Sequence, residues 1–388
     1  MIAINPTTRQ NNNGFHLDMV SVALVSVILL VGLVMVTSAS VTMGAKDGEP
    51  FGYLIRQSAS LFGGLTCALI MMFVPLERWQ KYSTPLLLLG MVMLLLVLLP
   101  GIGHVVKGSR RWIHLGFINF QASELARILL LTYVASYVVR REQELQTTFM
   151  GLLFPLGILA VGAGLLLVEP DFGSGVILLA TGLGVLFLAG ARLRYVFMIC
   201  GGGAVLIALV AVQSAYRVKR LTAFLDPWAD PYKTGFQLTQ SLIAIGRGEW
   251  FGVGLGASVQ KLFYLPEAHT DFLFAVLSEE FGFIGIFVMV ALVMALAFRA
   301  LMIARSASGA GLKFHAAMAA AFGIWYGLQS FTNMGVNMGL LPTKGLTLPF
   351  LSYGRSSLIV TVLWFGVLLR IHHEIVLAQI ANLRGGSK

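Results

Sequence analysis

The chain has 388 residues, of which 57% are apolar and 11% charged, and its 27 Lys and Arg against 17 Asp and Glu give a net charge of +10. Soluble domains carry about 25% charged residues. The composition therefore excludes an ordinary soluble enzyme, an intrinsically disordered protein and a nucleic-acid-binding domain, and it predicts an integral membrane protein.

The apolar residues gather into runs that are long enough to cross a hydrocarbon core of about 30 Å, which takes roughly 20 residues of helix. The runs lack the alternation of apolar and polar residues that a membrane β-barrel requires. The sequence thus predicts an all-α, polytopic membrane protein with about ten transmembrane helices. The predicted spans are 18–39, 57–75, 83–99, 122–140, 150–168, 173–190, 194–213, 271–302, 316–340 and 354–371.

The topology follows from the positions of Lys and Arg, which favour short cytoplasmic loops. Leaving out the long segment 214–270, the bias places the tails 1–17 and 373–388 in the cytoplasm. Residues 18–372 then form the transmembrane domain, and 214–270 is one large extracytoplasmic loop. Within it, residues 235–248 predict a short amphipathic helix at the membrane surface.

Two basic clusters fall on the predicted outer side, where Lys and Arg are usually few. Lys107, Arg110 and Arg111 form the first, and Arg217 and Arg220 belong to the second. Interfacial anchors that meet lipid headgroups are one explanation. The other is a binding site for an anionic ligand.

Ionisable residues inside a span are costly, so each is a functional candidate. Glu124 and Arg127 have the i, i+3 spacing of an intrahelical ion pair. Alternatively, Arg127 reaches Asp171 in the connection between spans five and six and holds a cavity in shape.

Asp271 opens the eighth predicted span, where it or Thr270 suits a helix N-cap. The same position facing outer-leaflet water suits a general base for a sugar hydroxyl. Glu279 lies about 12 Å further along the helix. It is therefore poorly placed to act with Asp271 as the carboxylate pair that soluble glycosidases use. His269 is expected to be a hydrogen-bonding loop residue, because no second ligand stands at metal-binding spacing.

Seven segments, in order, make the chain resemble the SEDS (shape, elongation, division and sporulation) family. The resemblance runs from about residue 20 to 372, and the segments 35–40 and 266–269 look more like the division branch than the elongation branch. The matching segments are 35–40, 107–113, 170–173, 220–228, 237–241, 264–275 and 341–353.

This resemblance implies a peptidoglycan glycosyltransferase that polymerises lipid II at the division septum, in the bacterial cytoplasmic (inner) membrane. It implies a class B penicillin-binding protein and other divisome membrane proteins as partners. It places the essential aspartate at Asp271 and gives the basic clusters an anion, the pyrophosphate of the lipid-linked disaccharide. No cofactor is implied with certainty; a divalent cation, Mg or Mn, is an additional way to stabilise the leaving group.

The residues expected to bind substrate are Lys107, Arg110, Arg111, Arg217, Arg220, Gln237, Lys261, His269, Lys344, Ser356 and Ser357. A lipid II flippase and a non-catalytic division scaffold are the alternative functions.

Two positions depart from the family pattern. Ala122 stands where the family usually has proline before Ser123, a change that a helix start tolerates. Arg355 replaces the second glycine of Ser-Tyr-Gly-Gly-Ser-Ser. This arginine either binds the anionic substrate or, if the glycine serves a positive φ or a close backbone approach, impairs activity.

Overall fold

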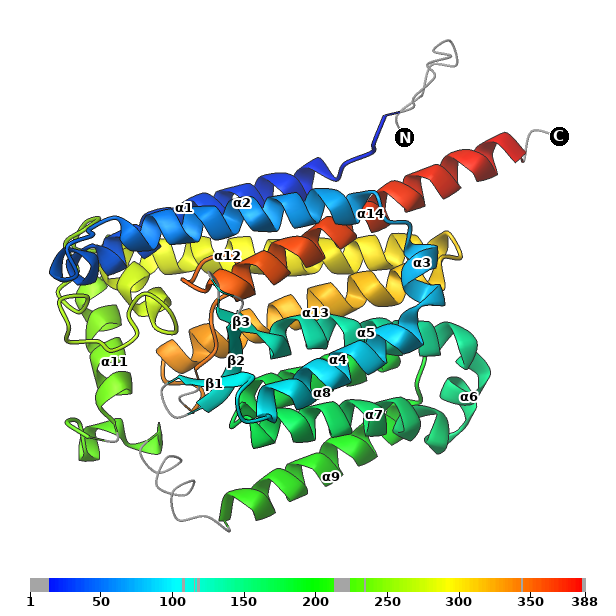
Figure 1. Cartoon of the computed structure of the whole chain (residues 1–388), viewed down its shortest axis with the longest axis horizontal. Helices are drawn as coiled ribbons and strands as arrows, with labels where there is room; N and C mark the ends of the chain where they lie inside the picture. Colours follow the sequence, from blue (N-terminus) through cyan, green and yellow to red (C-terminus); the bar gives the residue numbers. More distant parts are fainter. Residues whose placement is uncertain are drawn as a thin grey trace.

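The computed structural model describes residues 14–106, 109–114, 116, 119–212, 224–233, 235–342 and 345–385. Within these ranges, ten helices of 16 or more residues form the molecule, and most run along its long axis (Figure 1). They are α1 (Met19–Lys46), α2 (Gly52–Met72), α4 (Ser83–Leu98), α5 (Ala122–Arg140), α7 (Phe149–Val168), α8 (Phe172–Leu188), α9 (Leu193–Val212), α12 (Leu273–Gly309), α13 (Lys313–Asn337) and α14 (Arg355–Gly385).

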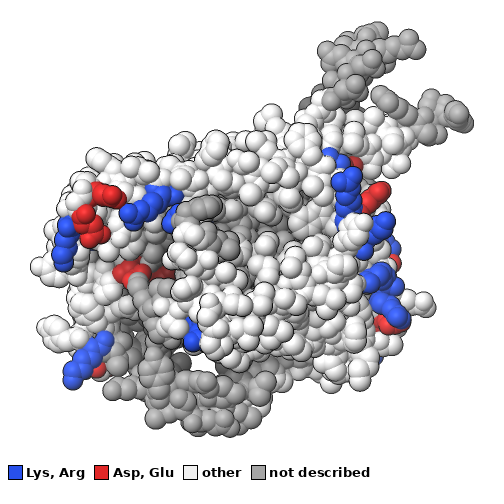
Figure 2. All heavy atoms as spheres, viewed as in Figure 1, with Lys and Arg blue, Asp and Glu red and all other residues white. Residues whose placement is uncertain are grey.

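Length and apolar composition allow six of these helices, α1, α2, α5, α7, α12 and α14, to cross a membrane, and α4 and α8 are shorter apolar helices. Figure 2 shows a broad uncharged band between two ends that carry the Lys, Arg, Asp and Glu side chains visible on this face. The architecture confirms a helical, multi-pass membrane protein, while the count of ten spans stays a prediction.

Helices α5 and α13 form the centre of the bundle. Most side chains of α5 are buried, as are the alanines of α13 between Ala317 and Ala321. A Cβ added at Gly323 would lie 3.1 Å from the carbonyl oxygen of Ala297 on α12. Small residues thus bring the backbones close, which is how helices associate where lipid removes the hydrophobic driving force.

A small antiparallel sheet was not predicted. Strands β1 (Gly103–Val106), β2 (Ser109–His114) and β3 (Asn119–Gln121) pair in the order β1-β2-β3, with Gly103 opposite Ile113 and Trp112 opposite Gln121. The strands are too short and too polar for their alternation to stand out in the sequence. Arg110 and Arg111 of the first basic cluster therefore lie on a strand of a hairpin rather than in a plain loop.

Helix α12 is longer than predicted and is interrupted at Gly282, whose φ of 64° lies in the left-handed region. A loop inserts at the break: Val253 and Gly254 donate to the carbonyls of Glu279 and Glu280, and Phe283 donates to the carbonyl of Glu249. These bonds satisfy backbone groups that the break would otherwise leave unpaired in an apolar setting.

The remaining short elements lie between the long helices or at their ends. The predicted amphipathic helix appears as α11 (Phe236–Gly248), at the end of the bundle that also carries the sheet (Figure 1). Helix α14 continues to Gly385, through most of the segment predicted as a tail. The others are α3 (Leu76–Lys81), α6 (Glu142–Thr147) and the 3-10 turn η1 (Pro227–Ala229).

Candidate active site

A cavity of about 620 Å³ opens at the sheet end of the bundle. We call it the Asp271 pocket. Its walls come from the first turn of α2, from β2 and β3, from the segment before α12 and from the segment that leads into α14. The lining residues include Arg56, Arg111, Trp112, Gln121, Glu267, His269, Thr270, Asp271, Gly345, Thr347, Tyr353, Arg355, Ser356 and Ser357.

Asp271 lies just before α12, which begins at Leu273 with Phe272 as its N-cap. The expected capping role of Asp271 or Thr270 is therefore wrong, because Thr270 Oγ1 donates instead to Glu267 Oε2 at 2.9 Å. Asp271 is half-buried. A Cβ built on Gly345 would lie 2.9 Å from Asp271 Oδ2, so glycine leaves room for the carboxylate.

Two buried asparagines on α13 hold the main chain at Asp271. Asn333 Nδ2 donates to the Asp271 carbonyl at 2.8 Å and to the Leu346 carbonyl at 2.5 Å. Asn337 Nδ2 donates to the same Asp271 carbonyl at 3.0 Å, and Asn337 Oδ1 accepts from Ala275 N–H at 3.1 Å. One helix thus fixes both the aspartate and the segment opposite it.

These asparagines belong to a stripe of buried side chains at i+4 spacing on α13: Trp325, Gln329, Asn333 and Asn337. Gln329 Oε1 accepts from Trp325 Nε1 at 2.8 Å and from Arg127 Nη1 at 2.6 Å. Gln329 Nε2 donates to the Thr347 carbonyl at 3.1 Å. The stripe therefore joins the interior of α5 to the wall of the pocket.

Three arginines line the pocket. Arg111 donates from Nε to the Glu169 carbonyl at 2.9 Å and from Nη2 to the Pro170 carbonyl at 2.7 Å, so its guanidinium is held by the α7–α8 connection. Arg56 pairs at 3.1 Å with Glu49 at the surface. Arg355 is the first residue of α14, with no positive φ, so an arginine fits this backbone without strain.

An aromatic cluster borders the pocket. The His269 ring lies 5.1 Å from Tyr53 and 5.5 Å from Tyr353, and Tyr353 N–H donates to the His269 carbonyl at 3.0 Å. Burial raises the pKa of the Tyr353 hydroxyl, which therefore keeps its proton at neutral pH. His269 is thus packed among aromatic rings, and its main chain is tied to Tyr353.

The structure brings together Asp271, His269, Arg111, Ser356 and Ser357 from three separate segments of the chain. It does not bring the other described candidates there. Arg110 donates to the Leu98 carbonyl at 3.2 Å, and Gln237 is exposed on α11. Lys107, Arg217, Arg220 and Lys344 lie outside the described residues.

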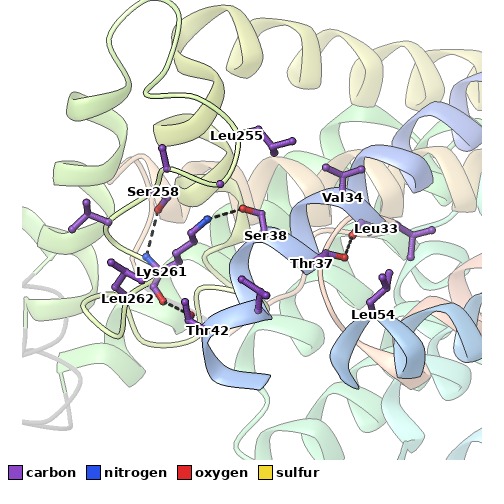
Figure 3. Close-up of a pocket in the computed structure, with 14 residues that line it drawn as sticks. Leu33, Val34, Thr37, Ser38, Thr42, Leu54, Leu255, Ser258, Lys261 and Leu262 are labelled. Carbon is purple, nitrogen blue, oxygen red and sulfur yellow. Dashed lines mark hydrogen bonds between the residues drawn. The ribbon is translucent and has the colours of Figure 1, made fainter. Parts of the chain in front are cut away.

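Lys261 does not line the Asp271 pocket either. Its Nζ is 2.9 Å from both Glu280 Oε1 and Ser38 Oγ, and the Lys261 and Glu280 side chains are buried (Figure 3). The expectation that Lys261 meets the substrate of this pocket is therefore not supported, because its charge is already neutralised inside the protein.

The structure decides whether Arg127 on the fourth predicted span pairs with Glu124 or with Asp171. Arg127 Nη2 pairs with Glu124 Oε2 at 3.0 Å, and both side chains are buried. Asp171 does not bridge to Arg127 but caps α8, accepting from Ser174 N–H at 3.2 Å and from Ser174 Oγ at 2.9 Å. The intrahelical pair is the one that forms.

Glu169, at the end of α7, is fully buried, and its two carboxylate oxygens have no hydrogen-bond partner among the described residues. Burial, reinforced by the neighbouring Asp171, raises its pKa to about 8. Glu169 is thus mostly neutral at pH 7.

Sequence reasoning missed Arg56, Tyr53, Asn333 and Asn337. A polar i+4 stripe inside an apolar span was the available signal for the two asparagines, since amides in such a helix are usually hydrogen-bonded across helices. Arg56 and Tyr53 gave no local signal, because only the fold brings α2 to Asp271.

These features define a multi-pass membrane protein with a polar, arginine-lined pocket at the sheet end of its helix bundle. A model of the FtsW, RodA and SpoVE family, described as cell cycle proteins, matches residues 18–376, and the chain belongs to this family. This confirms the SEDS resemblance.

Relatives and solved structures support the same family membership. The chain is 52% identical over 352 residues to the probable peptidoglycan glycosyltransferase FtsW of Nitrosococcus halophilus, covering 90% of this chain and 91% of that protein. It matches the rod shape determining protein RodA of Thermus thermophilus with a TM-score of 0.69, at 28% identity over 93% and 98% of the two chains. It matches a chain of a peptidoglycan synthase complex that coordinates polymerization and crosslinking with a TM-score of 0.76, at 28% identity over 92% and 98%.

Proposed function

We propose that this chain is a peptidoglycan glycosyltransferase of the division type, which polymerises lipid II into glycan strands. The 52% identity to a probable FtsW glycosyltransferase over most of both chains supports the activity. The observation that carries the chemistry is the placement of Asp271, whose main chain two buried asparagines hold in a pocket lined by three arginines.

In this mechanism the Asp271 carboxylate accepts the proton of the acceptor sugar hydroxyl. The hydroxyl oxygen attacks the donor anomeric carbon, and the bond from that carbon to the pyrophosphate oxygen breaks with inversion. The leaving lipid pyrophosphate takes the bonding electron pair. A positioned general base contributes typically 10²- to 10⁴-fold to rate.

The arginines stabilise the charge that develops on the pyrophosphate. Arginine suits this task because its planar fork of N–H groups matches phosphate oxygens. Arg111 donates from Nε and Nη2 to main-chain carbonyls, and these two bonds fix the orientation of its remaining N–H groups. Donors fixed before the reaction need no reorganisation as charge develops.

A Mg²⁺ or Mn²⁺ ion accompanying the pyrophosphate is part of the proposal. No group of three or more His, Cys, Asp or Glu that fits a metal is found in the described part of the chain. Glu267 and Asp271 are the pocket's carboxylates, and Mg²⁺ commonly binds one or two carboxylates together with substrate phosphates. An EDTA titration of polymerisation, with Mg²⁺ or Mn²⁺ added back, tests this requirement.

The proposed setting is the bacterial cytoplasmic membrane at the division septum, with both termini in the cytoplasm. A class B penicillin-binding protein is the proposed crosslinking partner, alongside other divisome membrane proteins. The structural match to a complex that couples polymerization to crosslinking supports such a partner.

The test uses purified protein, with its transpeptidase partner, and labelled lipid II. Asp271→Asn is expected to yield no glycan strands, whereas Asp47→Asn, an exposed aspartate after α1, polymerises normally. Normal polymerisation by Asp271→Asn would overturn the assignment of the base.

Two other functions predict different results. A lipid II flippase, suggested by the many spans and by internal charges such as Arg127 and Asp171, would translocate lipid II in proteoliposomes without forming strands. In the structure Arg127 is paired with Glu124. A scaffold would still support division with Asp271→Asn.

A further inference from the structure

One side-chain amide on α2 holds the segment that leads into α14. Gln57, which is 2% exposed, donates from Nε2 to the Ser352 carbonyl at 3.1 Å, and its Oε1 accepts from Gly354 N–H at 3.4 Å. Both partners are main-chain groups, 295 and 297 positions further along the chain. Gln57 thus fixes the course of the chain directly before Arg355, and it has no role in the chemistry proposed above.

The segment that Gln57 holds is strained and is anchored at both ends. Two amides of α13 bind its beginning, at the carbonyls of Leu346 and Thr347. Between these anchors Phe350 has a φ of 65°, a left-handed conformation that a bulky residue rarely adopts. Such a conformation persists only where the surrounding structure fixes it. Removal of the Gln57 anchor therefore lets the end of the segment nearest α14 move.

Helices α2 and α14 pack closely and run in the same direction. A Cβ added at Gly64 would lie 3.2 Å from the Cα of Ile359, and one added at Gly366 would lie 2.6 Å from the Cα of Ala68. Glycine thus brings the two backbones into contact, which keeps the helices at one distance. Because the helices are parallel, their first turns lie together at the Asp271 pocket.

Gln57 stands between two arginines that line the pocket. Arg56 precedes it on α2, and Arg355 follows the segment that it holds. Burial raises the pKa of the Tyr353 hydroxyl, and the positive charges of Arg355 and Arg56 partly offset this rise. Both guanidinium groups therefore lie near the same hydroxyl, at one side of the pocket.

We propose that Gln57 is a positioning residue, which holds Arg355 at a fixed distance from Arg56 so that both arginines bind the anionic head of the substrate. This inference rests on the proposed function and deepens it. Gln57 itself is buried and does not line the pocket, so it acts through Arg355. Arginine forks bind phosphate oxygens in a defined geometry, and this geometry is lost when one fork is free to move.

The variant that tests the role is Gln57→Met, which keeps the length of the side chain but forms neither hydrogen bond. It leaves the buried Ser352 carbonyl without its donor, and we expect the anionic head to bind about tenfold more weakly. The matched control is Thr132→Val on α5. It also removes one buried hydrogen bond, to the Ile128 carbonyl of its own helix, and it should not change binding.

Binding is measured as the dissociation constant of geranyl pyrophosphate, a probe that carries the pyrophosphate and only a short tail, on the purified full chain. Gln57→Met and Arg355→Gly should each raise this constant about tenfold. The double variant should also raise it about tenfold rather than a hundredfold, because two residues that act through one contact are not additive.

A hundredfold loss in the double variant would show that Gln57 acts independently of Arg355 and would overturn the proposal. An unchanged dissociation constant in Gln57→Met, an equal loss in Thr132→Val, or a parent chain that does not bind the probe would do the same. If the melting temperature shows that Gln57→Met does not fold, Gln57→Asn takes its place in the cycle, since its amide is one methylene shorter.

The binding cycle involves no glycan synthesis, so the positioning role and the proposed function can fail separately. In the polymerisation assay, Gln57→Met should raise KM for lipid II about tenfold and leave kcat nearly unchanged. A fall in kcat at an unchanged KM would mark a general distortion of the site and would contradict a role in binding the anionic head.

Discussion

The side-chain amide of Asn337 on α13 donates to the main-chain carbonyl of Asp271 at 3.0 Å, across 66 positions of sequence. The same amide group accepts from Ala275 N–H in the first turn of α12. A single buried side chain therefore ties the proposed base to the helix that follows it. The position of the carboxylate depends on α13 as much as on its own segment.

We predict that Asn337→Ala lowers kcat by roughly ten- to a hundredfold while KM changes little, because a small displacement of a reacting group is costly when binding is untouched. Thr332→Val on the same helix removes only a bond to the Leu328 carbonyl and serves as the control. Polymerisation rates at several lipid II concentrations separate the two constants. A wild-type kcat in correctly folded Asn337→Ala would contradict the positioning role.

Arg355 lines the Asp271 pocket, at the position where the resemblance to the SEDS family implies a glycine. We predict that Arg355→Gly raises KM for lipid II by about tenfold and that Arg355→Lys is intermediate, because lysine keeps the charge but not the planar fork. Arg194→Ala, which changes an exposed arginine outside the pocket, is the control. A gain of activity in Arg355→Gly would instead mark the arginine as an impairing residue.

The buried pair of Lys261 and Glu280 gives a stability prediction. Lys261→Met leaves a carboxylate buried without its partner, which typically costs 3–5 kcal/mol, so thermal unfolding of the purified protein should shift clearly downward. The double variant Lys261→Met with Glu280→Gln should recover part of the loss. Lys313→Met breaks an exposed pair with Glu142 and should cost about 0–1 kcal/mol. Equal losses in the buried and exposed variants would show that Lys261 contributes no more than a surface charge.

The raised pKa of buried Glu169 predicts that the stability of the fold depends on pH. Its pKa is raised from 4.5 to about 8 in the folded protein, chiefly by burial, so the folded state holds a proton that the unfolded state releases near pH 4.5. This contribution is fully present below pH 4.5 and disappears as pH rises through about 8. The melting temperature should therefore fall from pH 6 to 9 in the parent protein and fall less in Glu169→Gln. Glu77→Gln, an exposed residue on α3, should retain the parent slope.

The helices could be predicted because each long apolar run must be buried in the protein or face lipid along its whole length. The sheet could not, since its strands have only three to six residues and are too short to show an alternation of apolar and polar side chains. The true length of α12 was hidden as well. Gly282 adopts a positive φ that a hydropathy profile does not register, and the helix resumes beyond it.

Within the site, Asp271 could be proposed because an ionisable residue at the edge of a span is rare, and Arg111 because it belongs to a basic cluster on the predicted outer side. Lys261, expected to bind substrate once the resemblance was given, lies outside the pocket, because a charge alone does not show whether its partner is a ligand or, as here, Glu280. The contribution of α2 through Arg56 could not be foreseen from sequence, because it arises only when separate helices meet.

The break in α12 at Gly282 has a consequence for life in membranes of different thickness. Helices adjust to a thicker or thinner bilayer mainly by tilting. Because one inserted loop bonds to both sides of the break, residues 273–281 and 283–309 are held together and tilt as a unit. The bonds from Asn333 and Asn337 on α13 to the Asp271 carbonyl then tie that unit to a second helix.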